Sequence, residues 1–96
     1  MSAMCSILDE LYDIILDRID SKDPNSYTVK LVRKGKAYIA RKLGEEAIEV
    51  ILATLTESKE RIVNEIADLV YHLMVLMAVN NITLDDVCNE LSRRRK

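Results

Sequence analysis

The hydrophobic positions recur every three or four residues through most of the chain, and this spacing predicts helices. Between residues 7 and 19 the apolar side chains share one helical face, behind a helix-start signal at Ser6. Residues 21–26, SKDPNS, concentrate turn-forming residues and hold the only proline, so the first helix should end there. Ser26 can then cap a short helical segment that ends at Gly35.

Two long helices should follow, one from Lys36 to about Thr56 and one from about Ser58 to Val79. The residues expected to face inward on the first of them are Ile39, Leu43, Ala47, Val50, Ile51 and Thr54. The second is apolar on more than one side, which predicts burial on more than one side. Because a chain of 96 residues builds only a modest core, we expect that extra side to meet another copy of the chain.

The chain closes with a turn at residues 80–82 and a capping box, Thr83 with Asp86, that opens a last helix, TLDDVCNELSRR. Two glycines and one proline in 96 residues argue against disorder and against a turn-rich β architecture. We therefore expect a single all-α domain over residues 1–96, with four to five helices in a bundle completed by homodimerisation.

Charge and cysteine content narrow the possible partners. The net charge of −2 predicts no general attraction to nucleic acid or to anionic membranes, and the basic end at residues 93–96 is typical of a solubilising terminus. The longest apolar run, residues 69–79, is interrupted by His72 and is shorter than the roughly 18 residues of a membrane span. Cys5 and Cys88 form no CxxC motif, and no signal-like segment opens the chain, which favours a reduced, cytoplasmic protein.

The segments GEEAIEV and NEIADL set acids three residues apart among apolar positions. Residues at this spacing share a helix face, with their Cβ atoms roughly 5–6 Å apart, so Glu46 pairs with Glu49 and Glu65 with Asp68. Antiparallel packing of the two helices can bring both pairs face to face. Four carboxylates in a partly buried place would repel one another, and a divalent cation such as Mg²⁺ removes that conflict.

Such a site suits cleavage of a phosphoanhydride. The metal neutralises phosphate oxygens and lowers the pKa of a bound water, while a spare carboxylate, Glu45 or Glu49, accepts the proton. Paired acids on a helix are more often solvated, or are partners of Lys and Arg four residues away. Here the repetition of the motif beside an apolar stripe favours the metal site.

Basic residues precede the acids without an acid between them: Lys30, Arg33, Lys34, Lys36, Arg41 and Lys42. Taken alone, this stretch is typical of a solvated face, but directly before a carboxylate cluster it can bind a phosphorylated substrate. Lys42 is the strongest candidate because it stands one turn before Glu46. His72 follows Asp68 by four residues; a hydrogen-bonded interior histidine is favoured, then orientation of Asp68, and direct metal ligation last.

The two acidic segments fit the EExxE…ExxD signature of the all-α nucleoside triphosphate pyrophosphohydrolase superfamily, which includes the MazG proteins and dimeric dUTPases. SYTVKL, KLGEEAIEVILA, NEIADLVYHLMVLM and VCNELSRR together resemble the phosphoribosyl-ATP pyrophosphohydrolase family, over about residues 8–94. The resemblance implies a homodimeric helical bundle that hydrolyses phosphoribosyl-ATP to phosphoribosyl-AMP and pyrophosphate with Mg²⁺, the second step of L-histidine biosynthesis.

The same resemblance implies roles for particular residues. Glu46, Glu49, Glu65 and Asp68 would hold Mg²⁺, with Glu45 in the same acidic motif. The substrate-side positions are Ser26, Tyr27, Thr28, Lys34, Lys36 and Lys42. A MazG-like enzyme that removes unwanted nucleoside triphosphates is the nearest alternative, because the same acids could serve another base. A noncatalytic helical dimer that binds a nucleotide or a partner protein is the third.

Overall fold

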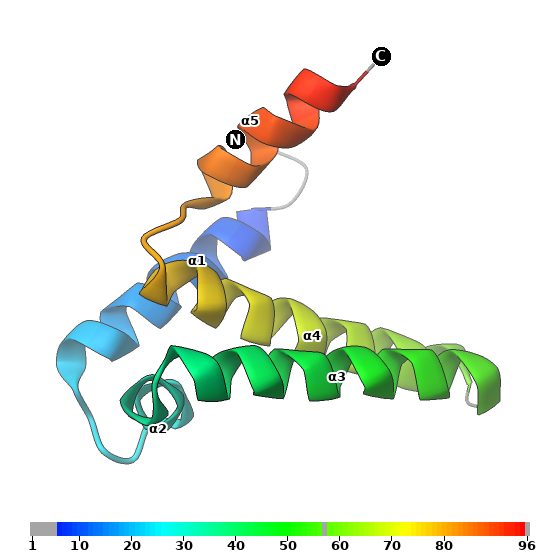
Figure 1. Ribbon diagram of the computed structural model, residues 1–96, viewed down its shortest axis with the longest axis horizontal. Helices are drawn as coiled ribbons and strands as arrows, with labels where there is room; N and C mark the ends of the chain where they lie inside the picture. The colour runs from blue at the N-terminus through cyan, green and yellow to red at the C-terminus, as the bar shows by residue number, and fades with distance from the viewer. Residues whose placement is uncertain (1–5, 57, 96) are drawn as a thin grey trace.

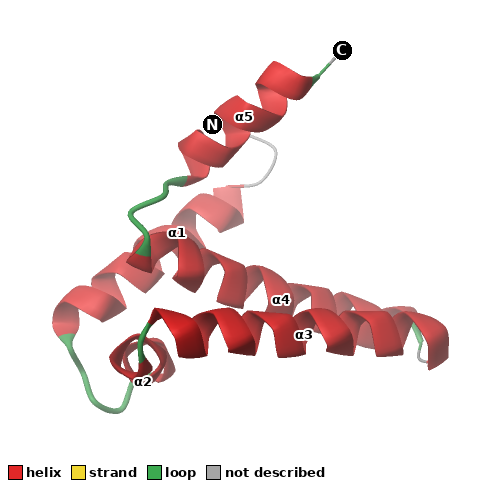
Figure 2. Ribbon diagram, in the orientation of Figure 1, coloured by secondary structure: helices red, strands yellow, loops and turns green. Residues whose placement is uncertain are grey.

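A computed structural model describes residues 6–56 and 58–95 of the chain. Within these residues the chain forms five helices and no strand (Figures 1 and 2). The helices are α1 (Ser6–Ser21), α2 (Tyr27–Lys34), α3 (Lys36–Thr56), α4 (Lys59–Val79) and α5 (Leu84–Arg94). This confirms the all-α prediction, and the segment before Gly35 is a helix of 8 residues in its own right.

The helix ends lie where the polar residues predict them. The Ser26 side chain accepts the backbone N–H of Val29 at 3.4 Å at the start of α2, and Gly35 ends that helix with a φ of 95°, a value that glycine adopts without a Cβ clash. The capping box before α5 is complete, because Asp86 N–H donates to Thr83 Oγ1 at 3.1 Å and Thr83 N–H donates to Asp86 Oδ2 at 2.9 Å.

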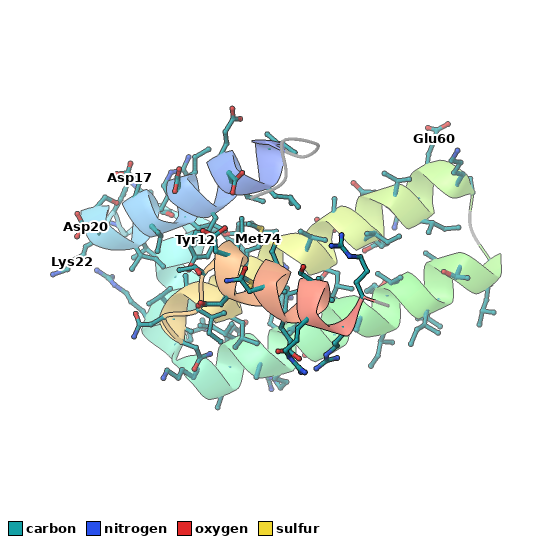
Figure 3. The ribbon with its side chains drawn as sticks, turned by 90° about the horizontal axis from the view of Figure 1, so that it is seen from above. Tyr12, Asp17, Asp20, Lys22, Glu60 and Met74 are labelled. Atoms are coloured by element: carbon teal, nitrogen blue, oxygen red, sulfur yellow. The ribbon has the colours of Figure 1, made fainter. Side chains whose placement is uncertain are left out.

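Helices α3 and α4 form a long antiparallel hairpin, and α1 and α2 pack against one end of it (Figure 1). The largest fully buried side chains are Ile15, Ile39, Met74 and Val75, contributed by α1, α3 and α4. Tyr12 belongs to the same core cluster and is labelled beside Met74 in Figure 3. Its hydroxyl donates a hydrogen bond to the Ile82 carbonyl at 2.5 Å. The core therefore fills only one half of the hairpin.

The other half of the hairpin carries apolar side chains that the described chain leaves exposed. They are Ile48, Ile51, Leu52 and Leu55 on α3 and Val63 and Ile66 on α4, and we call them the exposed apolar face. The prediction that Ile51 and Thr54 face inward is wrong for the single chain, since Ile51 is 58% exposed and Thr54 is also exposed. The physical reason is that α1 and α2 end their contacts before this part of α3, so only α4 packs against it.

By length and composition alone, α4 could cross a membrane. The core helix of a globular domain meets the same description, and α4 supplies Met74, Val75 and Met77 to the core. The predicted burial of α4 on more than one side is not reached within one chain, because Ile66 and Leu73 are each 43% exposed.

Helix α5 points away from the hairpin (Figure 1). Arg93 and Arg94 both pair with Glu90 on the same helix, so these two cations of the basic terminus are engaged locally. Cys88 is half-buried on α5, and Cys5 lies outside the described residues.

Candidate functional site

Three carboxylates from two helices converge at the middle of the hairpin. Glu46 projects from α3, Glu65 and Asp68 project from α4, and one oxygen of each lies within 4.8 Å of the others. The spacing of three places Glu65 and Asp68 on one face of α4, and the antiparallel packing of α3 brings Glu46 to that face. The structure thus brings together three of the four acids that the sequence nominates as metal ligands.

The three carboxylates of the cluster differ in their exposure to solvent. The Glu65 side chain is 9% exposed and accepts a 2.6 Å hydrogen bond from Nη2 of Arg61, one turn earlier on α4. Glu46 is 14% exposed at its side chain, with the Lys42 ammonium at 3.9 Å, whereas Asp68 is open to solvent. Two cations therefore offset part of the negative charge, and the exposed side of the cluster remains accessible to an ion and a substrate.

The other two acids of GEEAIEV point elsewhere. Glu45 is half-exposed and lies 3.7 Å from the Lys42 ammonium and 3.8 Å from the Arg41 guanidinium. Glu49, one turn beyond Glu46, is exposed and is not part of the group of three oxygens.

His72 is buried on α4, and both of its ring nitrogens have partners. Its Nδ1 lies 2.7 Å from the backbone carbonyl oxygen of Asp68, and its Nε2 lies 3.0 Å from the Tyr27 hydroxyl. The favoured interpretation of a hydrogen-bonded interior histidine agrees with this geometry. The link to Asp68 runs through the backbone, so His72 fixes the turn of α4 that carries the carboxylate.

Each residue of the SYT segment has its own position. Ser26 is buried as the cap of α2, and Thr28 is buried with its hydroxyl bonded to the Tyr71 hydroxyl. Tyr27 alone is open, at 47% exposure, with its ring stacked at 6.1 Å on that of Tyr71. Partial burial raises the pKa of Tyr27 and outweighs the opposite influence of Lys42, so the phenol stays protonated at neutral pH. Substrate contact by Ser26 and Thr28 stays a prediction.

The predicted basic residues lie in three different surroundings. Lys42 reaches the carboxylates, as described, while the Lys34 ammonium and the Arg41 guanidinium lie 4.9 Å and 5.2 Å from the centre of the Tyr38 ring. Lys36 is exposed at the start of α3. Of these basic residues, Lys42 is the one that the structure places against the carboxylate cluster.

Sequence reasoning missed three residues at this site: Arg61, Tyr71 and Tyr38. Arg61 stands four residues before Glu65, and this spacing alone could have suggested the ion pair. Tyr71 contacts Thr28, 43 residues away, so no local pattern marks it. Tyr38 stands four residues after Lys34 and three before Arg41, and this spacing could have suggested both contacts.

The arrangement suits a hard divalent cation. All of the candidate ligand atoms are carboxylate oxygens, and Mg²⁺ in proteins is commonly held by one or two carboxylates together with waters and substrate phosphates. Lys42 stands at the edge of the cluster, where it can contact a phosphate oxygen that the metal also binds. Carboxylate oxygens beside an ammonium group are the groups that bind a divalent cation and a phosphate.

Known proteins match nearly the whole chain. The family model described as phosphoribosyl-ATP pyrophosphohydrolase matches residues 8–95. A phosphoribosyl-ATP pyrophosphatase of Saccharolobus islandicus is 59% identical over 90 residues, which cover 94% of this chain and 96% of that protein. A phosphoribosyl-ATP pyrophosphatase of Sulfurisphaera tokodaii is 62% identical over 91 residues, which cover 95% of this chain and 97% of that protein. Another, of Saccharolobus solfataricus, is 58% identical over 90 residues, which cover 94% of this chain and 96% of that protein. The chain belongs to the phosphoribosyl-ATP pyrophosphohydrolase family.

Proposed function

We propose that this chain hydrolyses phosphoribosyl-ATP to phosphoribosyl-AMP and pyrophosphate in a Mg²⁺-dependent reaction, as the second step of L-histidine biosynthesis in the cytoplasm. The observation that carries the proposal is the convergence of Glu46, Glu65 and Asp68 from two helices onto one point. The family membership and the activity for which the relatives are named supply the substrate.

The acids divide into two tasks. Glu46, Glu65 and Asp68 would hold Mg²⁺, and Glu49, one turn beyond Glu46 on α3, would be a weaker fourth ligand that also serves as the base. The bound ion would neutralise phosphate oxygens and make a coordinated water more acidic. Arg61 holds Glu65 in place, which keeps the buried carboxylate aimed at the cluster.

The reaction adds water across the phosphoanhydride that joins the α- and β-phosphates, so one P–O bond forms, another breaks, and a proton leaves the water. Glu49 is the best placed acceptor of that proton, because it is exposed beside the cluster. Glu45 is engaged by Arg41 and Lys42, and we assign it to positioning Lys42 against the substrate phosphates. Lys34 and Lys36 would attract the distal phosphates by charge.

We also propose that two copies of the chain pair through the exposed apolar face. Six large aliphatic side chains lie together on one half of the hairpin, and contiguous apolar surface of this kind marks an interaction site. On α3 the face lies on the side opposite Glu46, since Ile48 stands two residues after Glu46 and is turned by about 200° around the helix.

A substrate panel tests the proposed function. We expect wild-type protein with Mg²⁺ to hydrolyse phosphoribosyl-ATP with a higher kcat/KM than ATP, dUTP or other simple triphosphates, and a chelator to abolish the activity. Asp68→Asn should lower kcat/KM by about 100-fold or more, because even partners outside a metal's own ligands are worth roughly 10- to 100-fold. Faster hydrolysis of a simple triphosphate would favour the MazG-like alternative. No hydrolysis of any triphosphate, together with stability and binding that Asp68→Asn leaves unchanged with and without Mg²⁺, would favour a noncatalytic dimer.

A further inference from the structure

Tyr27 and His72 form a hydrogen bond across the fold, 45 residues apart in the sequence. The Tyr27 hydroxyl lies 3.0 Å from Nε2 of the buried imidazole, and the two rings meet edge to face at 5.8 Å. The imidazole is itself packed edge to face on Tyr71, at 5.2 Å, and Tyr71 is held through its hydroxyl by Thr28. Three side chains, His72, Tyr71 and Thr28, therefore fix the direction of the Tyr27 hydroxyl.

The hydrogen-bond partner of His72 Nδ1 determines which ring nitrogen carries the proton. His72 Nδ1 faces the Asp68 backbone carbonyl at 2.7 Å, and a carbonyl oxygen can only accept a hydrogen bond. The ring proton of the neutral imidazole must therefore be on Nδ1, which leaves Nε2 as an acceptor. The Tyr27 hydroxyl then has to donate its only proton to Nε2.

A phenol whose proton is committed in this way keeps its oxygen lone pairs for other contacts. We propose that Tyr27 presents a hydrogen-bond acceptor to the substrate and recognises a donor on it, either a ribose hydroxyl or the amino group of the base, with His72 as the positioning residue that sets this polarity. The proposal rests on the proposed function and names a specificity determinant within it.

The location of Tyr27 fits a contact with the nucleoside part of the substrate. Tyr27 is 47% exposed as a residue, and the charges of Lys42 and Glu46 are close enough to act on its hydroxyl. Ionised phosphate oxygens accept hydrogen bonds and have no proton to donate, so a hydroxyl that faces them as an acceptor would repel them. Lys42 and the metal would therefore take the phosphates, and Tyr27 would take a neighbouring donor group.

The polarity can be observed without any enzyme assay, because His72 is the only histidine in the chain. Two-bond ¹H–¹⁵N spectra of the full-length, ¹⁵N-histidine-labelled protein at about pH 9, where an ordinary histidine is neutral, report which nitrogen carries the proton. We expect a protonated Nδ1 and an unprotonated Nε2, with a change at Nε2 in Tyr27→Phe. A proton on Nε2, or on both nitrogens, would overturn the proposal.

Kinetics with modified substrates then identify the donor. We expect Tyr27→Phe to lower kcat/KM for phosphoribosyl-ATP by about three- to tenfold, the value of one hydrogen bond. The same ratio of wild-type to Tyr27→Phe kcat/KM is then measured with analogues that each lack one ribose hydroxyl or the amino group of the base. We expect the ratio to persist for every analogue except one, and the group missing from that analogue is the donor. A ribose analogue would assign the contact to the sugar, and the amino analogue would assign it to the base.

Variants of His72 separate positioning from packing. In His72→Gln the side-chain amide oxygen can replace Nε2 as acceptor, whereas His72→Leu fills the space without one. We expect the Leu variant to raise KM more than it lowers kcat, and the Gln variant to restore most of the loss. If either variant fails to fold, the spectra and the Tyr27→Phe series carry the test alone.

Failure of this inference differs from failure of the proposed function. If wild-type protein hydrolyses phosphoribosyl-ATP and Asp68→Asn does not, the proposed function holds. If Tyr27→Phe then lowers kcat/KM equally for every analogue, or has no effect on phosphoribosyl-ATP, only the proposed recognition by Tyr27 is contradicted.

Discussion

Arg61 donates a 2.6 Å hydrogen bond to Glu65, and thereby pairs an exposed cation with the most buried acid of the carboxylate cluster. The Glu65 side chain is 9% exposed, so its charge requires a partner when no metal is bound. Arg61 supplies that partner without occupying Glu46 or Asp68. The pair explains how a protein with three converging carboxylates can fold before it binds an ion.

Arg61→Gln tests this explanation. Without metal, the variant should lower the unfolding free energy by about 1 kcal/mol. A buried hydrogen bond to a charged group contributes more than this, but Arg61 is half-exposed, and solvent weakens the interaction. Saturating Mg²⁺ should recover most of the loss, because the ion becomes the partner of Glu65. Urea unfolding with EDTA and with Mg²⁺ measures both quantities, and an equal loss in the two conditions would contradict the assigned role of Arg61.

Glu49 should act on turnover more than on metal affinity. Because its carboxylate lies outside the group of three, Glu49→Gln is expected to reduce kcat by about 100-fold, the lower end of general-base effects, and to change the Mg²⁺ dissociation constant far less. Steady-state kinetics over a range of Mg²⁺ concentrations separates the two. A large loss of Mg²⁺ affinity with kcat preserved at saturating metal would instead make Glu49 a ligand only.

Ile51 tests the proposed pairing of two chains. It is 58% exposed at the centre of the exposed apolar face, so Ile51→Asp should convert a dimer to a monomer in light scattering after gel filtration. Ile14→Asp is the matched control, because Ile14 is 47% exposed but lies on α1. Dissociation by the Ile14 variant and not by the Ile51 variant would move the interface to α1.

Tyr12 should make the fold sensitive to alkaline pH. Burial, and next the charge of Asp86, raises the pKa of its hydroxyl, so the folded state favours the neutral phenol. That contribution is complete below the ordinary pKa of about 10 and is lost as the pH rises through the folded-state value. The unfolding free energy should therefore fall above about pH 10, and fall less steeply in Tyr12→Phe.

Tyr12→Phe should also lose about 1 kcal/mol at neutral pH, because the hydrogen bond to the Ile82 carbonyl disappears. Urea unfolding of both proteins at pH values near 8 and 10.5 gives the comparison. Tyr27 ionises in both proteins, so the difference between the two curves isolates Tyr12. Parallel curves would contradict this account of Tyr12.

Local patterns predicted much of the fold because local hydrogen bonds decide the helix ends. The Ser26 cap, the Gly35 break and the Thr83–Asp86 capping box each depend on residues within four positions of one another. The orientation of Ile51 was mispredicted, because helical periodicity gives the face of a side chain but not whether another element covers it.

The same distinction between local and long-range contacts applies to the candidate site. A spacing of three residues was enough to nominate Glu65 and Asp68, because the helix itself sets their common direction. The bond between Tyr27 and His72 joins two helices over 45 residues, and only the packing of α2 against α4 creates it. Glu49 has the same spacing from Glu46 that Asp68 has from Glu65, yet only Asp68 belongs to the group of three, so the spacing alone does not decide which oxygens converge.

Titration with a divalent ion tests the convergence of the acids most directly, because it needs neither substrate nor turnover. Mn²⁺, which accepts the same oxygen ligands as Mg²⁺ and is visible by electron paramagnetic resonance, is added to wild type, Asp68→Asn and Glu60→Gln. Glu60 is an exposed acid at the far end of α4 (Figure 3) and serves as the matched control. We expect saturable binding in wild type and Glu60→Gln that is weakened at least about tenfold in Asp68→Asn; equal binding by all three proteins would contradict a metal site at Glu46, Glu65 and Asp68.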